Sequence, residues 1–335
     1  NINVTDASAE RVEFYNMSSG IRIDATADAA ANTTVEVVYT DATGSTDAQD
    51  FRVGALGADD GVGIVMADVE TVNIFAETAN QVDLDLSGVS MTAATATATV
   101  NFTGANDVEL VATNADITTI DASGMATGGA LVQTGRSATA ASTYTGSTGA
   151  DTLIMMNAND AIDGGTGNDT LDIDMTQAVG SMIIDLTSST DPLASVNGGS
   201  NAAVQKGFVH VNAEHVTGNG AFITGTAVAN TLTGSQAADQ IDGGALGDTI
   251  TGGTGGDTLT GGTGADTFVF AAGDSVLTIG GTGAAGTITG FDVITDFAKA
   301  DGTNNSETLN VQGTASIVGD STGINSTDST LLLGA

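Results

Sequence analysis

Aspartate or asparagine recurs at every ninth residue in two stretches of the chain, always among glycines and other small residues. The longer stretch, 225–269, divides into five nonamers: GTAVANTLT, GSQAADQID, GGALGDTIT, GGTGGDTLT and GGTGADTFV. In each of them the sixth residue is Asp or Asn and the eighth is aliphatic or Phe. Three more nonamers, GSTGADTLI, MMNANDAID and GGTGNDTLD, keep one register from Gly146. Carboxylate oxygens beside glycines, whose backbone turns freely, suit a hard divalent cation held by oxygen ligands.

This pattern resembles the nonapeptide G-G-x-G-x-D-x-U-x of the RTX (repeats-in-toxin) proteins, in which U is a large apolar residue. Eight nonamers in two phased runs carry the resemblance. It implies a calcium-binding parallel β-roll, in which each nonamer supplies a six-residue loop and a three-residue strand. A flexible Gly/Asp-rich linker is the alternative, but a linker needs no apolar residue in phase.

In such a roll two nonamers make one turn, so loops 18 residues apart stack on one edge. Only the central residue of each strand points inward, because successive side chains alternate between faces. The inward residues are expected to be Leu153, Ile162, Leu171, Leu232, Ile241, Ile250, Leu259 and Phe268. Stacked carboxylates repel one another, and a calcium ion between two loops removes that cost.

The predicted calcium ligands are the sixth-position side chains and the loop glycines whose carbonyls turn toward the ion. They are Asp151, Asp160, Asp169, Asn230, Asp239, Asp248, Asp257, Asp266, Gly165, Gly167, Gly244, Gly253, Gly255, Gly262 and Gly264. Asp151 is expected over Asp169, and Asp239 and Asp257 on the opposite edge from Asn230, Asp248 and Asp266. Loop pairs 18 residues apart give one full site in the first run and three in the second, with partial sites at the ends. The site of neutral Asn230 should be the weakest.

The charge balance points to the same kind of ligand. The chain of 335 residues has 41 Asp plus Glu against 6 Lys plus Arg, a net charge of -35. That excludes nucleic acid and anionic membrane surfaces, which select basic patches, and it favours divalent cations. Aromatic residues make up only 4%, which suits a thin, elongated core. There is no Cys, so calcium is the candidate that holds an extracellular fold together, and no apolar run is long enough for direct membrane insertion.

The chain ahead of the nonamers is predicted to be all-β. Residues 1–145 contain short runs that alternate apolar and polar residues, such as VDLDL from Val82 and TVNF from Thr99. Helical periodicity is nearly absent, and the spacing between strands has no clean period. An elongated, irregular parallel β-solenoid that continues into the RTX rolls is preferred, and a β-sandwich is the alternative.

Five regions follow from these patterns. They are 1–145, the irregular β-solenoid; 146–172, the first roll; 173–217, interrupting strands; 218–270, the second roll; and 271–335, a C-terminal β cap. In the cap, Phe291 and Phe297 are expected to cover the open end of the core, because an exposed β edge invites pairing. The apolar ending DSTLLLGA resembles the uncleaved signal of type I secretion. The start at Asn1, without Met, suggests a fragment or a processed product.

Acidic residues outside the nonamers are further candidate ligands. Val-Glu pairs at Val12–Glu13, Val69–Glu70 and Val108–Glu109 each begin a predicted strand. An outward-facing carboxylate is the preferred interpretation, and further calcium ligation is the alternative. The same two interpretations apply to Asp59 and Asp60 in a glycine-rich loop.

No catalytic constellation is present in the sequence. His210 and His215 lie in a strand-like run and should point to opposite faces, without the H-E-x-x-H of a metalloprotease. There is no G-x-S-x-G, and GTGAAG from Gly281 lacks the strand and helix of a nucleotide site. Asp83 and Asp85 are expected on a solvated strand face. The chain is therefore predicted not to be an enzyme.

The composition and the strand-rich first region resemble the RTX-bearing surface-layer (S-layer) proteins of Gram-negative bacteria. That resemblance implies a secreted, extracellular structural protein, exported by the type I machinery, that assembles with itself into a lattice through calcium. Anchoring to cell-surface polysaccharide would use a missing N-terminal part. The alternative is the calcium-folding and secretion module of a larger RTX adhesin or secreted enzyme. An autonomous enzyme is a third, less favoured hypothesis.

Overall fold

β-Strands make up the regular structure of the described chain. The computed structural model describes residues 2–5, 11–15, 21–24, 33–38, 47–53, 61–76, 81–91, 97–126, 128–134, 143–175, 181–188, 190–191, 193–196, 199–200, 203–271, 273–274, 278–280, 287–289, 291–297, 308–311, 316–317 and 331–334. No helix occurs among these residues, and hence none that is long and apolar enough to cross a membrane. Two compact units, 1–170 and 171–335, are described separately below.

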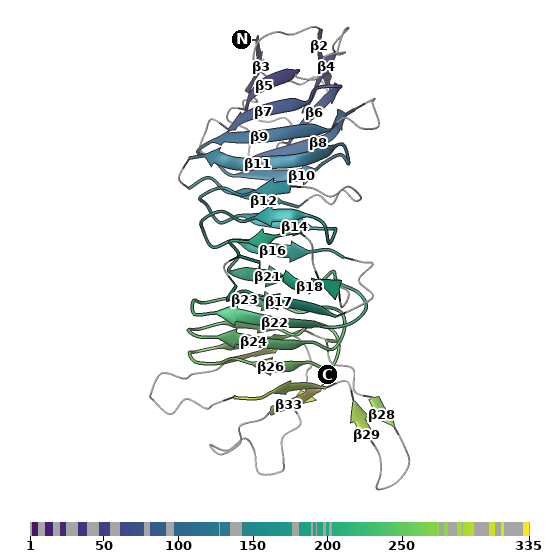
Figure 1. Cartoon of the computed structure of the whole chain (residues 1–335), viewed down its shortest axis with the longest axis vertical. Coiled ribbons are helices and arrows are strands. Elements are labelled where there is room, and N and C mark those ends of the chain that lie inside the picture. The colour runs from purple at the N-terminus through teal and green to yellow at the C-terminus, as the bar shows by residue number, and fades with distance from the viewer. Residues whose placement is uncertain are drawn as a thin grey trace. The chain divides into compact units, whose positions relative to one another are not determined.

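In the first unit, consecutive strands alternate between two parallel ladders (Figure 1). One ladder holds β1 (Ile2–Thr5), β3 (Ile21–Asp24), β5 (Ala48–Val53), β7 (Thr71–Ala76), β9 (Ala98–Gly104), β11 (Ile117–Met125), β13 (Thr143–Thr145) and β15 (Ala161–Asp163). The other holds β2 (Arg11–Tyr15), β4 (Thr33–Val38), β6 (Gly61–Ala67), β8 (Val82–Ser90), β10 (Val108–Ala112), β12 (Leu131–Gln133) and β14 (Thr152–Met155). The alternation confirms the parallel β-solenoid, and the parallel pairing excludes the antiparallel β-sandwich.

The rungs of this solenoid differ in length, as the missing sequence period suggested. Asn73 pairs with Asp50 across a rung of 23 residues, and Asn101 pairs with Asn73 across a rung of 28. Each amide donates to the side-chain oxygen of the rung before it, at 2.7 and 2.8 Å, so a polar ladder runs along the outside of the sheet. Between Asp151 and Asp169 the rung has shortened to 18 residues.

Alternation of side chains builds the core. In β8, Val82, Leu84 and Leu86 are at most 1% exposed, while the intervening Asp83 and Asp85 face outward as expected. All eight residues predicted to point inward from the nonamer strands are also at most 1% exposed. Because each rung contributes only a few apolar residues, burial of the whole stack supplies the hydrophobic stabilisation.

In the second unit the rolls form two parallel ladders closed by short antiparallel strands (Figure 1). The first ladder holds β21 (His210–Asn212), β23 (Thr231–Thr233), β25 (Thr249–Thr251), β27 (Thr267–Phe270) and β31 (Thr308–Val311). The second holds β17 (Met182–Asp185), β22 (Ala221–Thr226), β24 (Gln240–Gly244), β26 (Thr258–Thr260) and β30 (Asp292–Ile294). Smaller elements are β16 (Thr170–Ile173), β18 (Leu193–Val196), β19 (Gly199–Ser200), β20 (Gln205–Lys206), β28 (Thr278–Gly280), β29 (Thr287–Thr289), β32 (Ser316–Ile317) and β33 (Leu331–Gly334).

The C-terminal segment closes the rolls with strands. β31 pairs in parallel with β27, and β30 pairs in parallel with β26. β33 then runs antiparallel to β30, so it covers the edge that β30 would otherwise expose. Phe291 and Phe297, expected to cover the core, are only half-buried, and Ile294 is the fully buried apolar side chain among residues 291–297. The cap therefore works mainly through backbone pairing. The GTGAAG sequence lies outside the described residues.

We expect Phe102→Ala to lower the free energy of unfolding by about 3–5 kcal/mol, the usual cost of emptying a fully buried phenyl site. Phe102 is 1% exposed in β9. Val111→Ala is the control, because Val111 is 37% exposed and its truncation should cost at most about 0.5 kcal/mol. Chemical denaturation at fixed calcium measures both, and equal shifts would contradict the buried position of Phe102.

Candidate metal-binding loops

The sixth-position side chains of loops 18 residues apart lie above one another, and we call each such set a column. Within a column, each later side chain is hydrogen-bonded to the backbone of the loop one turn upstream. The Oδ1 atom of Asp169 accepts the backbone N–H of Asp151 at 2.8 Å, 18 residues upstream. In the second unit, Asp248 accepts from Asn230 at 2.7 Å, and Asp266 accepts from Asp248 at 2.9 Å. On the other ladder Asp257 accepts from Asp239 at 2.8 Å. The pairs expected from 18-residue spacing are therefore brought together.

Four of these carboxylates have a second oxygen without a hydrogen-bond partner among the described residues. These atoms are the Oδ2 atoms of Asp169, Asp248, Asp257 and Asp266. Each of the four side chains is at most 1% exposed. A buried, unpaired carboxylate oxygen costs several kcal/mol. A bound cation is the ordinary way to offset such a cost.

Backbone carbonyls approach these oxygens from the neighbouring loop. A Cβ atom on Gly243 would lie 2.5 Å from Asp248 Oδ2 and 2.7 Å from the carbonyl oxygen of Gly261, in the next loop. A Cβ on Gly262 would collide with the carbonyl oxygen of Gly244, and Gly262 has a φ of 93°. Only glycine fits both the close approach and the left-handed backbone. The result is a set of carboxylate and carbonyl oxygens, the donor set that Ca²⁺ takes.

Positive φ is shared by all seven glycines predicted as carbonyl ligands. They are Gly165, Gly167, Gly244, Gly253, Gly255, Gly262 and Gly264. No cluster of three or more His, Cys, Asp or Glu suited to a metal occurs among the described residues. An ion held between two of the described loops would therefore take most of its oxygens from backbone carbonyls. The part of each glycine in binding an ion stays a prediction.

Burial changes the acidity of these carboxyls. It raises the pKa of Asp257 from 3.8 to about 8, and the negative charges of Asp292 and Asp239 add to that shift. Burial likewise raises the pKa of Asp169 to about 7, with Asp151 contributing. The pKa of Asp248 rises to about 6 for the same main reason. Hydrogen bonds from backbone N–H groups oppose the shift in all three cases without cancelling it. Without a cation, the columns hold their charge poorly at neutral pH.

The other four predicted sixth-position ligands are held by their own loops. The Oδ2 atom of Asp160 accepts the N–H of Met156 at 3.1 Å and that of Asn157 at 2.9 Å. Each of the remaining three side chains accepts a hydrogen bond at 2.6 Å from the backbone N–H four residues upstream. Asp151 accepts from Ser147, Asn230 accepts from Thr226, and Asp239 accepts from Ser235. These four residues are buried in the loops as expected, but their oxygens already have protein partners.

Two carboxylates of the closing segment join the site without having been predicted. Asp292 is 1% exposed, and its Oδ1 accepts the N–H of Asp257 at 2.9 Å across 35 residues. It therefore occupies the register place of a sixth-position Asp. Asp296 accepts the N–H groups of Gly261 and Gly262 at 3.0 and 2.7 Å, fixing the start of the last roll loop. The signal was present, since Asp292 and Ile294 repeat the spacing of positions six and eight, but no Gly-Gly precedes them.

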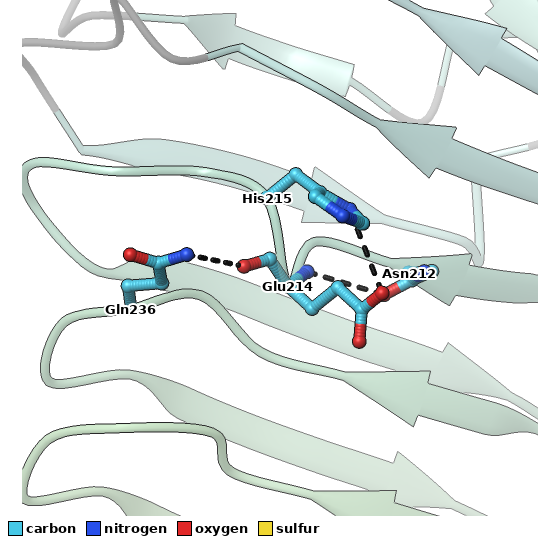
Figure 2. A network of polar contacts seen from close by, with 4 residues as sticks. All are labelled: Asn212, Glu214, His215 and Gln236. Carbon is cyan, nitrogen blue, oxygen red and sulfur yellow. Dashed lines mark hydrogen bonds and ion pairs between the residues drawn. The ribbon is translucent and has the colours of Figure 1, made fainter. Parts of the chain in front are cut away.

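The histidines and the Val-Glu carboxylates have other surroundings. His210 accepts the N–H of Thr231 at Nδ1, 2.9 Å away. His215 lies in a turn rather than in a strand, contrary to the prediction, because β21 ends at Asn212. Figure 2 shows Asn212, Glu214, His215 and Gln236 in one polar network, in which Glu214 Oε1 is 3.5 Å from His215 Nδ1 and the Glu214 carbonyl accepts from Gln236 at 3.1 Å. This network ties the turn to the next rung.

Among the Val-Glu pairs, Glu70 accepts the N–H of Asp47 at 2.9 Å, and Glu109 accepts the hydroxyl of Thr134 at 3.0 Å. Both carboxylates thus connect neighbouring rungs, which favours the structural interpretation over calcium ligation. The side chain of Glu13, and Asp59 and Asp60, lie outside what the structure describes.

Comparison with known proteins agrees with this geometry. The family of the RTX calcium-binding nonapeptide repeat (4 copies) matches residues 141–172, 217–245 and 243–277. These ranges contain all eight nonamers. No curated protein and no solved structure matches the chain. RTX nonapeptide repeats bind calcium ions, so Ca²⁺ is the cation for these loops. The chain therefore carries RTX calcium-binding nonapeptide repeats in its roll segments, 141–172 and 217–277.

Proposed function

We propose that this protein is a structural component of a bacterial surface layer, which folds and assembles with calcium outside the cell and is not itself an enzyme. RTX repeats are calcium-binding modules typical of proteins exported by type I secretion. The observation that carries the calcium step is the set of four buried Oδ2 atoms without a partner in the described part of the chain. Their loops are incomplete until a cation is bound.

Calcium binding would drive folding through mass action. Extracellular calcium modules have dissociation constants of about 10⁻⁴ to 10⁻³ M. An ion that binds only the folded state adds about 2.7 kcal/mol of stability when it is present at one hundred times its dissociation constant. Ions in one column share loops, so their contributions are coupled. Inside the cell, where free calcium is scarce, the rolls would stay unfolded and suitable for export.

Self-assembly is the step that the surface-layer function adds. A net charge of -35 makes copies of the chain repel one another, and bound divalent cations reduce that repulsion. The outward faces of the solenoid carry polar ladders such as Asp50–Asn73–Asn101, which leave the molecule soluble until copies meet. Anchoring to cell-surface polysaccharide belongs to the same proposal and would use another part of the protein.

A second candidate function is the calcium-folding and secretion module of a larger RTX adhesin or secreted enzyme. The observation that favours it is the extent of the family match, which covers the rolls at 141–172 and 217–277 and leaves the solenoid unmatched. Both functions share the calcium-dependent rolls. They differ in whether the chain assembles with itself.

We expect the β-rich circular dichroism spectrum of the rolls to be lost in EDTA at pH 8 and recovered when millimolar calcium is added. Removal of the ions leaves the Oδ2 atoms of Asp169, Asp248, Asp257 and Asp266 without a partner in the described part of the chain. At pH 8 the carboxyls of Asp169 and Asp248, with pKa values raised to about 7 and about 6, are ionised. Magnesium at the same concentration is the control, because it prefers a rigid octahedron and keeps its water. A spectrum that ignores chelation would contradict calcium-dependent folding.

Acidification in the absence of calcium should stabilise the rolls. The folded-state pKa is raised to about 6 at Asp248, about 7 at Asp169 and about 8 at Asp257. An acid whose pKa is raised on folding favours the fold below its unfolded pKa, and that stability is lost as the pH rises through its folded pKa. Melting temperatures in EDTA should therefore fall between about pH 4 and pH 8. At pH 7 calcium binding should release protons, measured calorimetrically in two buffers of different ionisation enthalpy.

Purified chain in millimolar calcium should form ordered sheets visible by electron microscopy, and EDTA should disperse them. Assembly requires both folded rolls and reduced charge repulsion. Magnesium again serves as the control. If the chain folds with calcium yet stays monomeric at high concentration in light scattering, the surface-layer proposal fails and the secretion-module function stands.

A further inference from the structure

The glycine-led loops fall into two kinds, distinguished by the second residue. We call a loop open when that residue is glycine and closed when it is Ser or Thr. The open loops are Gly164–Asp169, Gly243–Asp248, Gly252–Asp257 and Gly261–Asp266. The closed loops are Gly146–Asp151, Gly225–Asn230 and Gly234–Asp239. The two kinds differ in backbone conformation, in hydrogen bonding and in their place along the chain.

Backbone conformation separates them first. The second-position glycines of the open loops have left-handed φ values; these are 90° for Gly165, 101° for Gly244, 94° for Gly253 and 93° for Gly262. Among the described non-glycine residues, only Asp68 and Leu246 have positive φ. Ser147, Thr226 and Ser235 therefore have the ordinary negative φ. The two kinds of loop turn their second peptide in different directions.

Hydrogen bonding separates them in the same way. In a closed loop the N–H of the second residue donates to the sixth side chain at 2.6 Å, as Ser235 does to Asp239 Oδ2. The Ser235 hydroxyl also donates to Asp239 Oδ1 at 2.7 Å and accepts the N–H of Ala237 at 3.1 Å. Ser147 and Thr226 make the corresponding contacts in their loops. In the open loops, the Oδ2 atom has no such partner among the described residues.

Each closed loop stands first in its column. Asp151 precedes Asp169, Asn230 precedes Asp248, and Asp239 precedes Asp257, each by 18 residues. The neighbours upstream of them lie outside the nonamers and donate or accept through the backbone. Leu131 N–H donates to Asp151 Oδ1, Ala221 N–H donates to Asp239 Oδ1, and Asn230 Nδ2 donates to the Val209 carbonyl at 2.6 Å. The upstream end of each column is thus completed by protein groups.

The residue types agree with this division. The sixth residue is Asp in all four open loops, where a charge must face the cation. The one neutral amide, Asn230, lies in a closed loop, where it binds the Thr226 N–H through Oδ1. A closed loop therefore tolerates the loss of the carboxylate charge, as expected if no ion binds there.

We propose that the closed loops are metal-free end caps, so that the rolls bind one ion per open loop and none at the sixth residue of a closed loop. Ser147, Thr226 and Ser235 hold the caps together in place of calcium. A capped loop still contributes to the first ion of its column through its backbone, because the Ser235 carbonyl oxygen lies against Gly253 of the open loop below. This inference rests on the proposed calcium-dependent folding and adds which loops need the ion.

The test is one substitution made in two consecutive loops of one column. We expect Asp257→Asn in the full chain to lower the number of calcium ions bound by one, and Asp239→Asn to leave that number unchanged. Equilibrium dialysis followed by elemental analysis counts the ions. Asp169→Asn and Asp151→Asn repeat the comparison in the first roll. Loss of an ion from Asp239→Asn or Asp151→Asn would overturn the inference.

Two controls keep the result interpretable. If Asp257→Asn does not fold, the closed-loop variants decide alone, since a full ion count supports the caps and a reduced count refutes them. If the unmodified chain binds no calcium, the proposed function fails as well. If the unmodified chain binds calcium but Asp239→Asn binds one ion fewer, the metal-free caps are refuted and the proposed function is not.

The hydroxyl groups give an independent readout. Ser235→Ala should leave the ion count unchanged but raise the calcium concentration for half-maximal folding by about twofold to tenfold, the equivalent of one hydrogen bond. Thr254→Ala is the matched control, because Thr254 is exposed in the next open loop of the same column. A changed ion count, or equal midpoints for both variants, would contradict the cap.

Discussion

A buried carboxylate oxygen with no hydrogen-bond partner among the described residues is the constraint on which the rolls depend. Asp257 Oδ2 illustrates it, since its side chain is fully buried and burial raises its pKa to about 8. A protein could remove the cost by protonating the acid or by supplying a donor. In the open loops no donor to this oxygen occurs among the described residues, and carbonyl oxygens of the neighbouring loop lie close to the loop glycines instead. A cation or a proton satisfies such an oxygen, so the stability of the loop is linked to the calcium concentration and the pH of the solvent.

In the solenoid ahead of the rolls, side-chain oxygens are paired with hydrogen-bond donors of the protein instead of a cation. Its outward polar residues pair across rungs, as in Asp50 with Asn73, or bind backbone N–H groups, as Glu70 does with Asp47. The acceptors in these pairs have donors from neighbouring rungs, whereas Asp47 Oδ2 is buried without a hydrogen-bond partner in the described part of the chain. One parallel architecture therefore contains rungs joined by hydrogen bonds from polar side chains and rungs whose buried oxygens suit an ion. The difference lies in the loops, since the buried apolar positions follow the same alternation throughout.

The sequence predicted the parts of the fold that repeat. Strict spacing placed Leu259 and Phe268 in the core and set Asp248 over Asp266, because an 18-residue turn fixes both ladder and column. It did not reveal Asp292, whose column neighbour lies 35 residues away, because an insertion hides the register. Nor did it place His215 in a turn, since FVHVNAEHV has the apolar content of a strand throughout. Most importantly, a consensus that asks only for a sixth-position acid treats Asp239 and Asp257 alike.

The difference between Asp239 and Asp257 depends on the residue at the second position of each loop. A serine at the second position offers a hydroxyl and an N–H to the sixth side chain, whereas a glycine with positive φ turns its peptide and leaves that oxygen to the ion. The eighth residue of the nonamer is an apolar side chain buried in the core in both cases. The number of ions that a roll requires can therefore change by single substitutions at this position without rebuilding the coil. Since each ion adds its own increment of free energy, the second residue of the loops determines how steeply folding depends on calcium.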